Sequence, residues 1–357
     1  MSKIPSTMQA CVLDDYGKLS VVQLPVPAPQ RDEVLCRVRA IAICGTDPEI
    51  ISGRHKSKNW PPYFPFVMGH EWSGEVVALG EGVTNFAVGD RVCGEAHCGC
   101  GQCENCMRGH YTICLNYGKN ESGHRHYGFN NQGANAQYNA FRTKSLTKMP
   151  DSLDFAAATL CDTAGIAMHS AELAGVTPGG TVAIYGPGPI GLCTLGVIKS
   201  MGADRVIVVG RGHRLEVAGQ MGADVCINFE KEDPVARIVE LTGGIGADEV
   251  YECSGAAITP WQSVYSVRKG GKVALVGFYE DEEVPRLPVT KIVNEEIKIL
   301  GSKANPNVSD KVVRMLSKGI VDHGKIISHR IPLAEYERAL DIFVNRKENA
   351  VKVVIEP

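Results

Sequence analysis

Four cysteines lie close together in one short stretch of this 357-residue chain: Cys100, Cys103, Cys106 and Cys114. Thiolates at such spacing can converge on one tetrahedral Zn²⁺ at about 2.3 Å, and four sulfur ligands leave no open position, which is typical of a structural metal. An iron–sulfur cluster also uses four cysteines, so the sulfurs alone leave the metal open. Cys98 is a fifth thiol nearby, and we expect it to be a spectator.

Two shorter motifs place further metal-binding residue types earlier in the chain. Cys44–Asp47 reads Cys-Gly-Thr-Asp, and Gly69–Glu71 reads Gly-His-Glu. Cysteine and histidine both bind zinc, and a catalytic zinc takes three protein ligands and keeps one position open. A lone cysteine or histidine is more often a packed core residue, so neither motif is decisive by itself.

A glycine-rich segment lies in the middle of the chain. Gly186–Gly191 reads Gly-Pro-Gly-Pro-Ile-Gly, follows the apolar run Thr181–Tyr185 and opens an apolar helical pattern. In this context the first glycine makes a tight turn, the second lets the backbone approach a pyrophosphate, and the third lets the helix pack on the strand. The helix N-terminus offers N–H groups to the phosphates. The alternative is a plain tight turn. The predicted dinucleotide-binding residues are Gly186, Gly188, Pro189, Ile190 and Gly191.

The residue after the next predicted strand bears on the choice of cofactor. That strand, 205–209, is followed by Gly210 and Arg211, where NAD-binding units usually carry an acid for the ribose 2′-hydroxyl. Glycine does not repel a 2′-phosphate, and Arg211 can bind one in a bidentate manner. The pattern therefore predicts a preference for NADP, with contacts from Gly210, Arg211 and Arg214. In the alternative interpretation, the two arginines only solvate a surface turn.

The elements that carry these motifs change character near Pro150. Before it, runs such as 34–40 and 73–79 favour strands, and a long polar segment covers 115–137. After it, apolar strands alternate with helical patterns, which is typical of a doubly wound parallel sheet. We therefore expect an α/β protein with a β-rich first part.

Composition excludes several classes of function. The chain is 44% hydrophobic and 22% charged, with a net charge of −3, so there is no basic excess for nucleic acid or an anionic membrane. No apolar run reaches the ~20 residues of a membrane span, and the first ten residues lack the apolar core of a signal peptide. Thirteen cysteines without such a signal favour a reducing, cytoplasmic setting. The expected partner is a small molecule.

Taken together, the four motifs resemble the zinc-dependent medium-chain dehydrogenases, which include alcohol, sorbitol and threonine dehydrogenases. The resemblance runs from residue 8 to the C-terminus, with the motifs in the family order. It implies a GroES-like, β-rich catalytic domain at 1–155 and 296–357, with a Rossmann domain at 156–295 inserted in it. It also implies two zinc ions per chain, NADP or NAD, reversible oxidation of an alcohol to a carbonyl, and a homodimer or homotetramer.

The resemblance also implies roles for single residues. Cys44 and His70 would bind the catalytic zinc, with Asp162 as the third ligand and its neighbour Cys161 as the rival. Glu71 resembles the family's nearby carboxylate, which can approach the metal when water leaves.

Further roles implied by the resemblance concern the proton and the cofactor. Thr46 would accept the hydroxyl proton. Glu49 stands where relatives often carry a relay histidine, so it could act as a base, face water or contact the substrate. The remaining cofactor residues would be Ser254, in the segment 253–255, and Val276, Gly277 and Lys352; the alternative is that these are ordinary sheet-edge and surface residues.

The substrate is the least determined part. A carboxylate third ligand occurs among polyol and secondary-alcohol enzymes of this family, which favours a polyol, cyclitol or sugar derivative over a simple secondary alcohol. The polar segment could contact hydroxyls or could be a solvated loop, and the aromatic residues before Gly69 could wall a pocket or belong to the core. A metal-free binding protein of the same fold and a zinc-independent reductase remain alternatives. The residues concerned are Asn120, Glu121, His124, Arg125, His126 and Asn130 in the segment, and Trp60, Tyr63 and Phe64 before Gly69.

Overall fold

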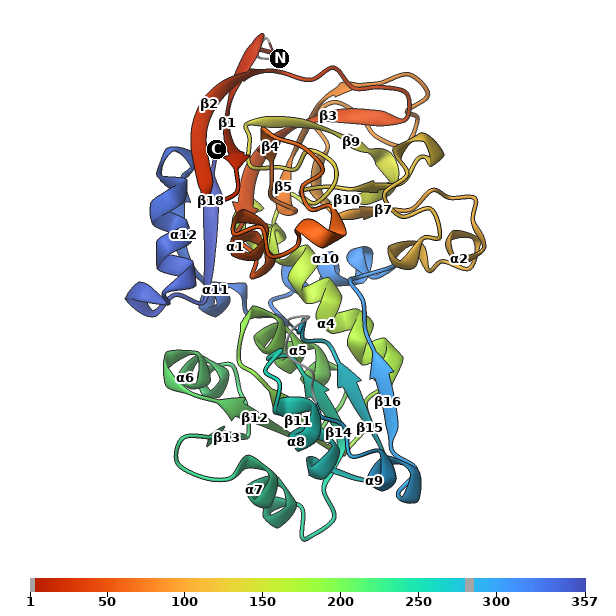
Figure 1. Cartoon of the computed structure of the whole chain (residues 1–357), viewed down its shortest axis with the longest axis vertical. Coiled ribbons are helices and arrows are strands. Elements are labelled where there is room, and N and C mark those ends of the chain that lie inside the picture. Colours follow the sequence, from red (N-terminus) through yellow and green to blue (C-terminus); the bar gives the residue numbers. More distant parts are fainter. Residues whose placement is uncertain (1–3, 280–285) are drawn as a thin grey trace. The chain divides into compact units, whose positions relative to one another are not determined.

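The structure, a computed structural model, describes residues 4–279 and 286–357 (Figure 1). The chain forms two compact units, each assembled from separate stretches of sequence. The expected domain boundaries at 155 and 296 stay predictions. Unit 1 comprises Met1–Asp162, Pro306–Ser317 and Ile327–Pro357, and unit 2 comprises Thr163–Asn305 and Lys318–Ile326.

The larger sheet of unit 1 has the strand order β10-β6-β5-β3-β18-β17, with β9 also paired to β3. Central strand β3 brings residues from distant parts of the sequence together, because β5 lies on one side of it and β18 on the other. Its core includes Trp72 stacked on Phe141, with ring centroids 4.0 Å apart. The strands are β3 (Glu33–Ala42), β5 (Glu71–Leu79), β6 (Arg91–Gly94), β9 (Tyr138–Arg142), β10 (Leu146–Lys148), β17 (Ile327–Pro332) and β18 (Lys352–Glu356).

Smaller elements complete unit 1. A second sheet has the order β2-β1-β4, and a short pair joins β7 to β8. The strands are β1 (Thr7–Asp15), β2 (Lys18–Pro25), β4 (Phe66–Val67), β7 (His97–Cys98) and β8 (Arg125–His126). The helices are α1 (Thr46–Ile51), α2 (Glu104–Met107), α3 (Phe155–Ala158), α10 (Ser309–Ser317) and α12 (Tyr336–Val344), and α4 (Leu160–Ala174) begins in this unit.

Unit 2 contains a six-stranded sheet in the order β13-β12-β11-β14-β15-β16, and every pairing in it is parallel. Strands alternate along the chain with helices, so the expected doubly wound parallel sheet is confirmed. The strands are β11 (Thr181–Tyr185), β12 (Arg205–Gly210), β13 (Val225–Asn228), β14 (Ala247–Glu252), β15 (Val267–Leu275) and β16 (Lys298–Gly301). The helices are α5 (Pro189–Ser200), α6 (Gly212–Gln220), α7 (Pro234–Leu241), α8 (Thr259–Ser266), α9 (Val289–Asn294) and α11 (His323–Ile326).

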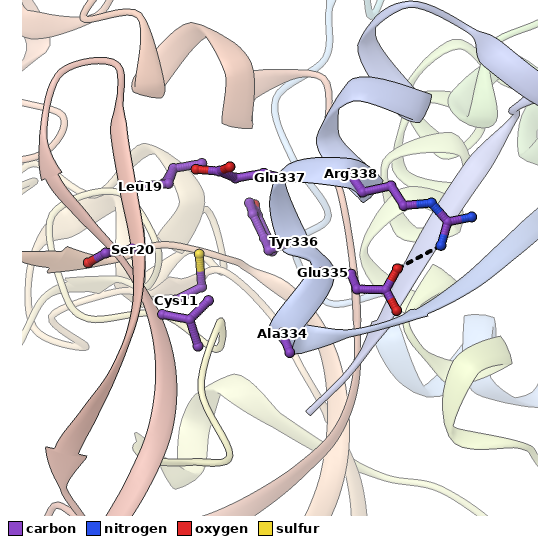
Figure 2. Close-up of a pocket in the computed structure, with 9 residues that line it drawn as sticks. Cys11, Leu19, Ser20, Ala334, Glu335, Tyr336, Glu337 and Arg338 are labelled. Carbon is purple, nitrogen blue, oxygen red and sulfur yellow. Dashed lines mark hydrogen bonds and ion pairs between the residues drawn. The ribbon is translucent and has the colours of Figure 1, made fainter.

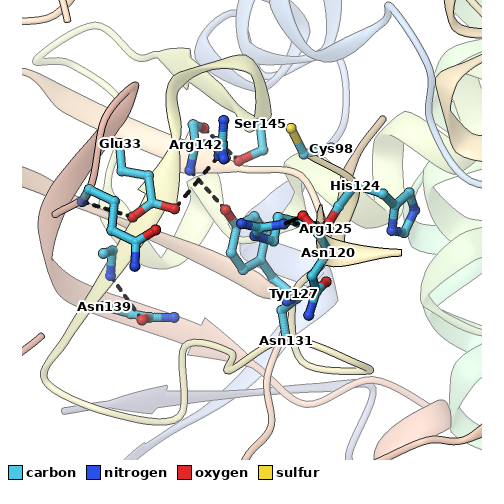
Figure 3. A network of polar contacts seen from close by, with 12 residues as sticks. Glu33, Cys98, Asn120, His124, Arg125, Tyr127, Asn131, Asn139, Arg142 and Ser145 are labelled. Carbon is cyan, nitrogen blue, oxygen red and sulfur yellow. Dashed lines mark hydrogen bonds and ion pairs between the residues drawn. The ribbon is translucent and has the colours of Figure 1, made fainter. Parts of the chain in front are cut away.

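The polar segment 115–137 divides into an exposed and a buried part. Asn120 and Glu121 are exposed, whereas His124, His126 and Asn130 are buried. Polar contacts hold the buried part and the neighbouring strands in place, as Figure 3 shows; among them, the hydroxyl of Tyr127 accepts a hydrogen bond from an arginine backbone N–H at 2.8 Å. A solvated loop is therefore the wrong interpretation for the second half of the segment.

Within the described residues, no helix combines the length and the apolar character needed to cross a membrane.

Candidate active site

Cys44, His70 and Glu71 form one group of metal-binding side chains in unit 1. Their donor atoms all lie within 4.8 Å of one another. Strand pairing explains the meeting: Ala42 near the end of β3 pairs with Glu71 at the start of β5, so Cys44, two residues beyond Ala42, reaches the same place. A backbone constraint holds His70, because Gly69 before it has φ +88° and a Cβ there would lie 2.2 Å from Asn135 Oδ1.

Asp47 also belongs to this site, although the sequence analysis assigned it no role. Its Oδ2 accepts a hydrogen bond from the backbone N–H of Cys44 at 2.9 Å, and its Oδ1 lies 3.9 Å from Nδ1 of His70. Burial raises the pKa of Asp47, while His70 opposes that shift. At this distance the contact is electrostatic, and Asp47 raises the pKa of His70 through its charge. The sequence signal that could have identified Asp47 is its position three residues after Cys44 in the same motif.

Asp162 is buried near this group, but its carboxylate is not among the donor atoms that lie within 4.8 Å of one another. Burial raises its pKa to about 6, with His70 acting in the opposite direction. The thiol of Cys161, the rival ligand, is 3.9 Å from the backbone oxygen of Ser309. Asp162 as a zinc ligand therefore stays a prediction, and Glu71 is the carboxylate that the structure brings to Cys44 and His70.

Lys352 lies in the same place rather than in unit 2. Its Nζ is 2.5 Å from Oε2 of Glu71, and both side chains are almost fully buried. Burial lowers the pKa of Lys352, but Glu71 and Cys44 raise it by more, so the net shift is upward. In this structure the lysine neutralises Glu71, and its expected contact with a pyrophosphate stays a prediction.

The charge of the group fits a dication. Burial lowers the pKa of His70, but Cys44 and Asp47 outweigh it and raise that pKa to about 10. A cluster that draws a proton this strongly holds an excess of negative charge, and a buried cation compensates such an excess. Sulfur, imidazole and carboxylate ligands together are the donor set of catalytic zinc. Cys44, His70 and a carboxylate thus fit the metal that the motifs predict.

Thr46 and Glu49 lie near the group on helix α1. The Thr46 hydroxyl is buried, with no hydrogen-bond partner among the residues that the structure describes. Glu49 is three residues further along, on the same helical face. Its Oε2 lies 2.7 Å from Nε2 of His55, a buried residue that the sequence analysis did not single out. Only the folded chain shows that an imidazole accompanies this carboxylate.

Aromatic contacts lead from the metal group to the polar segment. His70 lies 4.6 Å from Phe129, which stacks on His126 at 3.8 Å, and Trp60 lies 5.5 Å from His126 between ring centroids. Trp60 is buried in a core cluster, whereas Tyr63 is half exposed. Buried imidazoles are thus connected to the metal group through ring contacts.

The four clustered cysteines also converge. Their sulfurs all lie within 4.8 Å of one another; Cys100 and Cys106 are 3.9 Å apart, and Cys103 and Cys114 are 3.8 Å apart. Tetrahedral Zn–S bonds of about 2.3 Å place ligand sulfurs about 3.8 Å apart, so the spacing fits one zinc ion. Desolvation raises the pKa of Cys100, but surrounding N–H groups lower it by more, to about 6. Cys98 lies outside the group.

In unit 2, the glycine loop follows β11 and leads into α5. Gly186 has φ +96°, and a Cβ on Gly191 would lie 2.0 Å from the Gly186 carbonyl oxygen. A Cβ on Gly188 would meet nothing within 4 Å. The first and third glycines therefore allow a tight turn and close packing, and the second leaves open space beside the helix N-terminus at Pro189. That cradle fits a pyrophosphate.

The other predicted cofactor residues follow neighbouring strand ends of the same sheet. Buried Glu252 accepts a hydrogen bond from Ser254 Oγ at 2.6 Å, and its backbone oxygen accepts from the N–H groups of Val276 and Gly277, both at 2.9 Å. Parallel sheets bind ligands at the carboxyl ends of their strands. Glu252 thus organises the segment that the sequence predicts to line the cofactor site, and it had not been predicted itself.

Beside the end of β12, Arg211 is paired with another residue. Its Nη1 lies 2.6 Å from Oε1 of Glu230, and both side chains are about half exposed. Arg214 lies on helix α6. An exposed pair of this kind is weakly held, so Arg211 can exchange its partner for another anion.

A separate hollow of about 380 Å³ lies in unit 1 (Figure 2), lined by β1, β2 and the segment 334–338. None of the predicted metal or cofactor residues lines it. Burial raises the pKa of the Cys11 thiol at its wall to about 12, which makes the thiol a poor nucleophile. No chemistry of the site depends on it.

Comparison with known proteins identifies the family. Residues 30–151 match the alcohol dehydrogenase GroES-like domain, and residues 189–318 match the zinc-binding dehydrogenase domain. The chain is 34% identical over 355 residues to a sorbitol dehydrogenase of Bacillus subtilis (strain 168), covering 99% of this chain and 98% of the relative. The chain belongs to the zinc-type medium-chain dehydrogenases. Both the expected fold class and the expected family are confirmed.

Two further similarities place this dehydrogenase more closely. It is 33% identical over 347 residues to a D-arabitol-phosphate dehydrogenase of Enterococcus avium, covering 96% of this chain and 94% of the relative. It is also similar to a solved zinc-binding dehydrogenase of Sinorhizobium meliloti 1021 bound to NADP, with a TM-score of 0.90, 32% identity, and 99% and 100% of the two chains covered. The expected activity, a nicotinamide-dependent alcohol or polyol dehydrogenase, is confirmed at this level.

Proposed function

We propose that this dehydrogenase oxidises a secondary hydroxyl of a polyol, cyclitol or sugar derivative to a ketone, with NADP as the preferred acceptor. The observation that carries the proposal is the convergence of Cys44, His70 and Glu71. Thr46 follows Cys44 by two residues, and its buried hydroxyl has no hydrogen-bond partner in the described part of the chain. Sorbitol and D-arabitol-phosphate dehydrogenases among the relatives support a hydroxyl-rich substrate.

Cys44, His70 and a carboxylate from Glu71 or Asp162 would hold the catalytic zinc. When bound, zinc supplies a Lewis acid that lowers the pKa of a substrate hydroxyl, and the nicotinamide supplies the hydride acceptor. Thr46 accepts the hydroxyl proton at Oγ1. Asp47 adds negative charge 3.9 Å from Nδ1 of His70, and Lys352 balances the charge of Glu71.

Glu49 and His55 together form the outer part of the proton path. Oε2 of Glu49 faces Nε2 of His55 at 2.7 Å, and the Glu49 side chain is 26% exposed, so the pair connects a buried imidazole with solvent. Thr46 and Glu49 share a face of α1, which puts the carboxylate next along the helix from the proton acceptor. In this way Glu49 takes the place of the relay histidine found in relatives.

The buried imidazoles support a polar substrate over a simple secondary alcohol. His126 is connected to His70 through Phe129, and the hydroxyl of Tyr117 is hydrogen-bonded to Nδ1 of His126. Imidazole and phenol groups next to a metal site can satisfy several hydroxyls of one substrate.

The remaining parts of the proposal concern metal content, cofactor and assembly. The cysteine lobe would hold a second, structural zinc, and the absence of a carboxylate at Gly210 next to Arg211 favours NADP. Strand β16 lies at the edge of its sheet, and α9 nearby exposes Val289 and Val293 by 64% and 69%. These features support a homodimer or homotetramer through that edge.

One assay tests the proposal. Zinc-replete protein is incubated with NAD⁺ or NADP⁺ and with polyols, cyclitols, polyol phosphates, 3-hydroxy amino acids and simple secondary alcohols, and reduced cofactor is followed. We expect turnover on hydroxyl-rich substrates, faster with NADP⁺, together with two zinc ions per chain. Turnover confined to simple secondary alcohols would overturn the substrate class, and a higher kcat/KM with NAD⁺ would overturn the cofactor preference.

A further inference from the structure

Gly210 and Pro187 meet in unit 2 where two neighbouring strands end. Strands β11 and β12 are parallel, with Tyr185 paired to Val209, so the loop after β11 passes the last residue of β12. A Cβ built on Gly210 would lie 2.3 Å from both Cδ and Cγ of Pro187. Real Cβ atoms essentially never come closer than 3.0 Å to a heavy atom, so a side chain at 210 requires one of the two segments to move.

Gly210 is needed for space and not for backbone freedom. Its φ is outside the positive range, and it is paired in regular register with Asn228 of β13. An ordinary residue would therefore suit its backbone. Pro187 in turn cannot easily move, because its ring is fixed to the backbone and is buried. The preceding residue, Gly186, is also closely packed, since a Cβ built on it would lie 2.8 Å from Cα of Ser254.

This contact has a consequence for the cofactor. Position 210 is where dinucleotide-binding units place the acid that binds the ribose 2′-hydroxyl. We propose that Pro187 is a specificity-determining residue of this dehydrogenase: by occupying the space beside Gly210, it excludes an acidic side chain from the end of β12 and thereby favours NADP over NAD. The effect on the choice between NADP and NAD rests on the proposed NADP preference. The steric exclusion of a side chain at position 210 depends only on the contact with Pro187.

The exclusion of an acidic side chain at position 210 also affects the partners of Arg211. It is the residue next to Gly210, and its guanidinium carbon lies 5.6 Å from the ring centre of Phe229 while Nη1 contacts Glu230. A second carboxylate at 210 would compete for the same guanidinium and repel a 2′-phosphate. Keeping 210 without a side chain leaves Arg211 with Glu230 as its exposed carboxylate partner, which a phosphate can replace.

A stability cycle tests the exclusion. Thermal unfolding is measured for the parent, Gly210→Ala, Pro187→Ala and the double variant, without cofactor. Replacing glycine by alanine at an ordinary φ normally stabilises a protein, but here we expect Gly210→Ala to lower Tm by about 5 °C. In the Pro187→Ala background, the same Gly210→Ala change should lower Tm by less than half as much as it does in the parent. Gly188→Ala is the matched control, because its Cβ meets nothing, and its Tm should stay close to that of the parent. Equal losses with and without Pro187, or a stable Gly210→Ala, would overturn the exclusion.

A binding experiment tests the specificity. The Kd values of NAD⁺ and NADP⁺ are measured by calorimetry for the parent, Gly210→Asp and Pro187→Ala/Gly210→Asp. Only the double variant should shift the ratio of the two Kd values toward NAD⁺, by about tenfold or more. A single Gly210→Asp variant with that shift, or a stable double variant without it, would overturn Pro187 as a specificity residue. If the parent itself binds NAD⁺ more tightly, the proposed NADP preference fails, and the stability cycle still decides the exclusion.

Discussion

Glu71 and Lys352 form an ion pair in the interior of unit 1, with Oε2 and Nζ 2.5 Å apart and neither side chain more than 3% exposed. They come from β5 and β18, which flank β3 on opposite sides. Glu71 also belongs to the donor group with Cys44 and His70. The lysine therefore offsets part of the negative charge that the metal-binding group concentrates, and it holds the carboxylate beside that group.

Removing the lysine should destabilise the protein strongly. In Lys352→Met the buried Glu71 loses its cation, and breaking such a pair costs about 3–5 kcal/mol. We expect a fall of this size in the free energy of unfolding of the zinc-loaded protein, measured by urea denaturation at neutral pH. The matched Lys352→Met/Glu71→Gln variant should recover most of it. A loss of only about 1 kcal/mol, the value of an exposed pair, would contradict the role of the contact.

The hydroxyl of Thr46 should be essential for turnover and dispensable for cofactor binding. Thr46→Ala removes the proton acceptor, and positioned proton transfer contributes about 10²–10⁴-fold to a rate. We expect kcat to fall by a factor in that range, with the Kd of the cofactor unchanged, measured by steady-state kinetics and calorimetry. Thr46→Ser keeps the hydroxyl and should retain most of the rate. Turnover of Thr46→Ala close to that of the parent would exclude Thr46 from the reaction.

The cysteine lobe should hold its own zinc ion. Cys103→Ser removes one of four converging sulfurs, so we expect the zinc content, measured by elemental analysis after gel filtration, to fall from two ions per chain to one, with a lower Tm. Cys98→Ser is the control, because Cys98 is buried nearby but lies outside the group, and it should keep both ions. Unchanged zinc in Cys103→Ser would contradict the four-sulfur site.

Glu95 should make stability fall as pH rises toward neutrality. It accepts a hydrogen bond from Tyr111 at 2.6 Å and another from Ser309, and burial raises its pKa to about 7 in the folded chain. A group whose folded pKa is raised holds its proton more tightly when folded, so its stabilisation is complete below the unfolded value and is lost as pH approaches 7.

The variant Glu95→Gln keeps an acceptor but cannot ionise. As pH rises from 5 to 8, the free energy of unfolding of this variant should increase relative to that of the parent by a total of about 3 kcal/mol. Urea denaturation at a series of pH values measures this difference. Asp310 is the comparison, since it contributes to the raised pKa of Glu95 only through its charge, and Asp310→Asn should reduce the pH dependence without abolishing it. A difference between Glu95→Gln and the parent that does not change with pH would contradict the prediction.

The spacing of residues along the chain was enough to predict the cysteine group and the glycine loop. Cys100, Cys103 and Cys106 are too close in sequence to separate in space, and the glycine loop acts within one strand–turn–helix unit. Their chemistry follows from residue type and order, whatever the rest of the chain does. The alternation of apolar strands and helical patterns after Pro150 predicts the parallel sheet for the same reason, because each strand and helix has its own periodicity.

Pairings between distant residues were decided by the tertiary structure alone. Lys352 meets Glu71 because β18 and β5 pair with the same strand, and Asp47 lies beside His70 because the end of β3 pairs with the start of β5. In the sequence, Gly210 indicates only that no carboxylate is present to repel a 2′-phosphate. The fold shows in addition that Pro187 leaves no room for a side chain at this position. Sequence thus determines which chemistry is available in each short segment, whereas strand register and packing distances determine which side chains share a site, since contact depends on space that no linear spacing records.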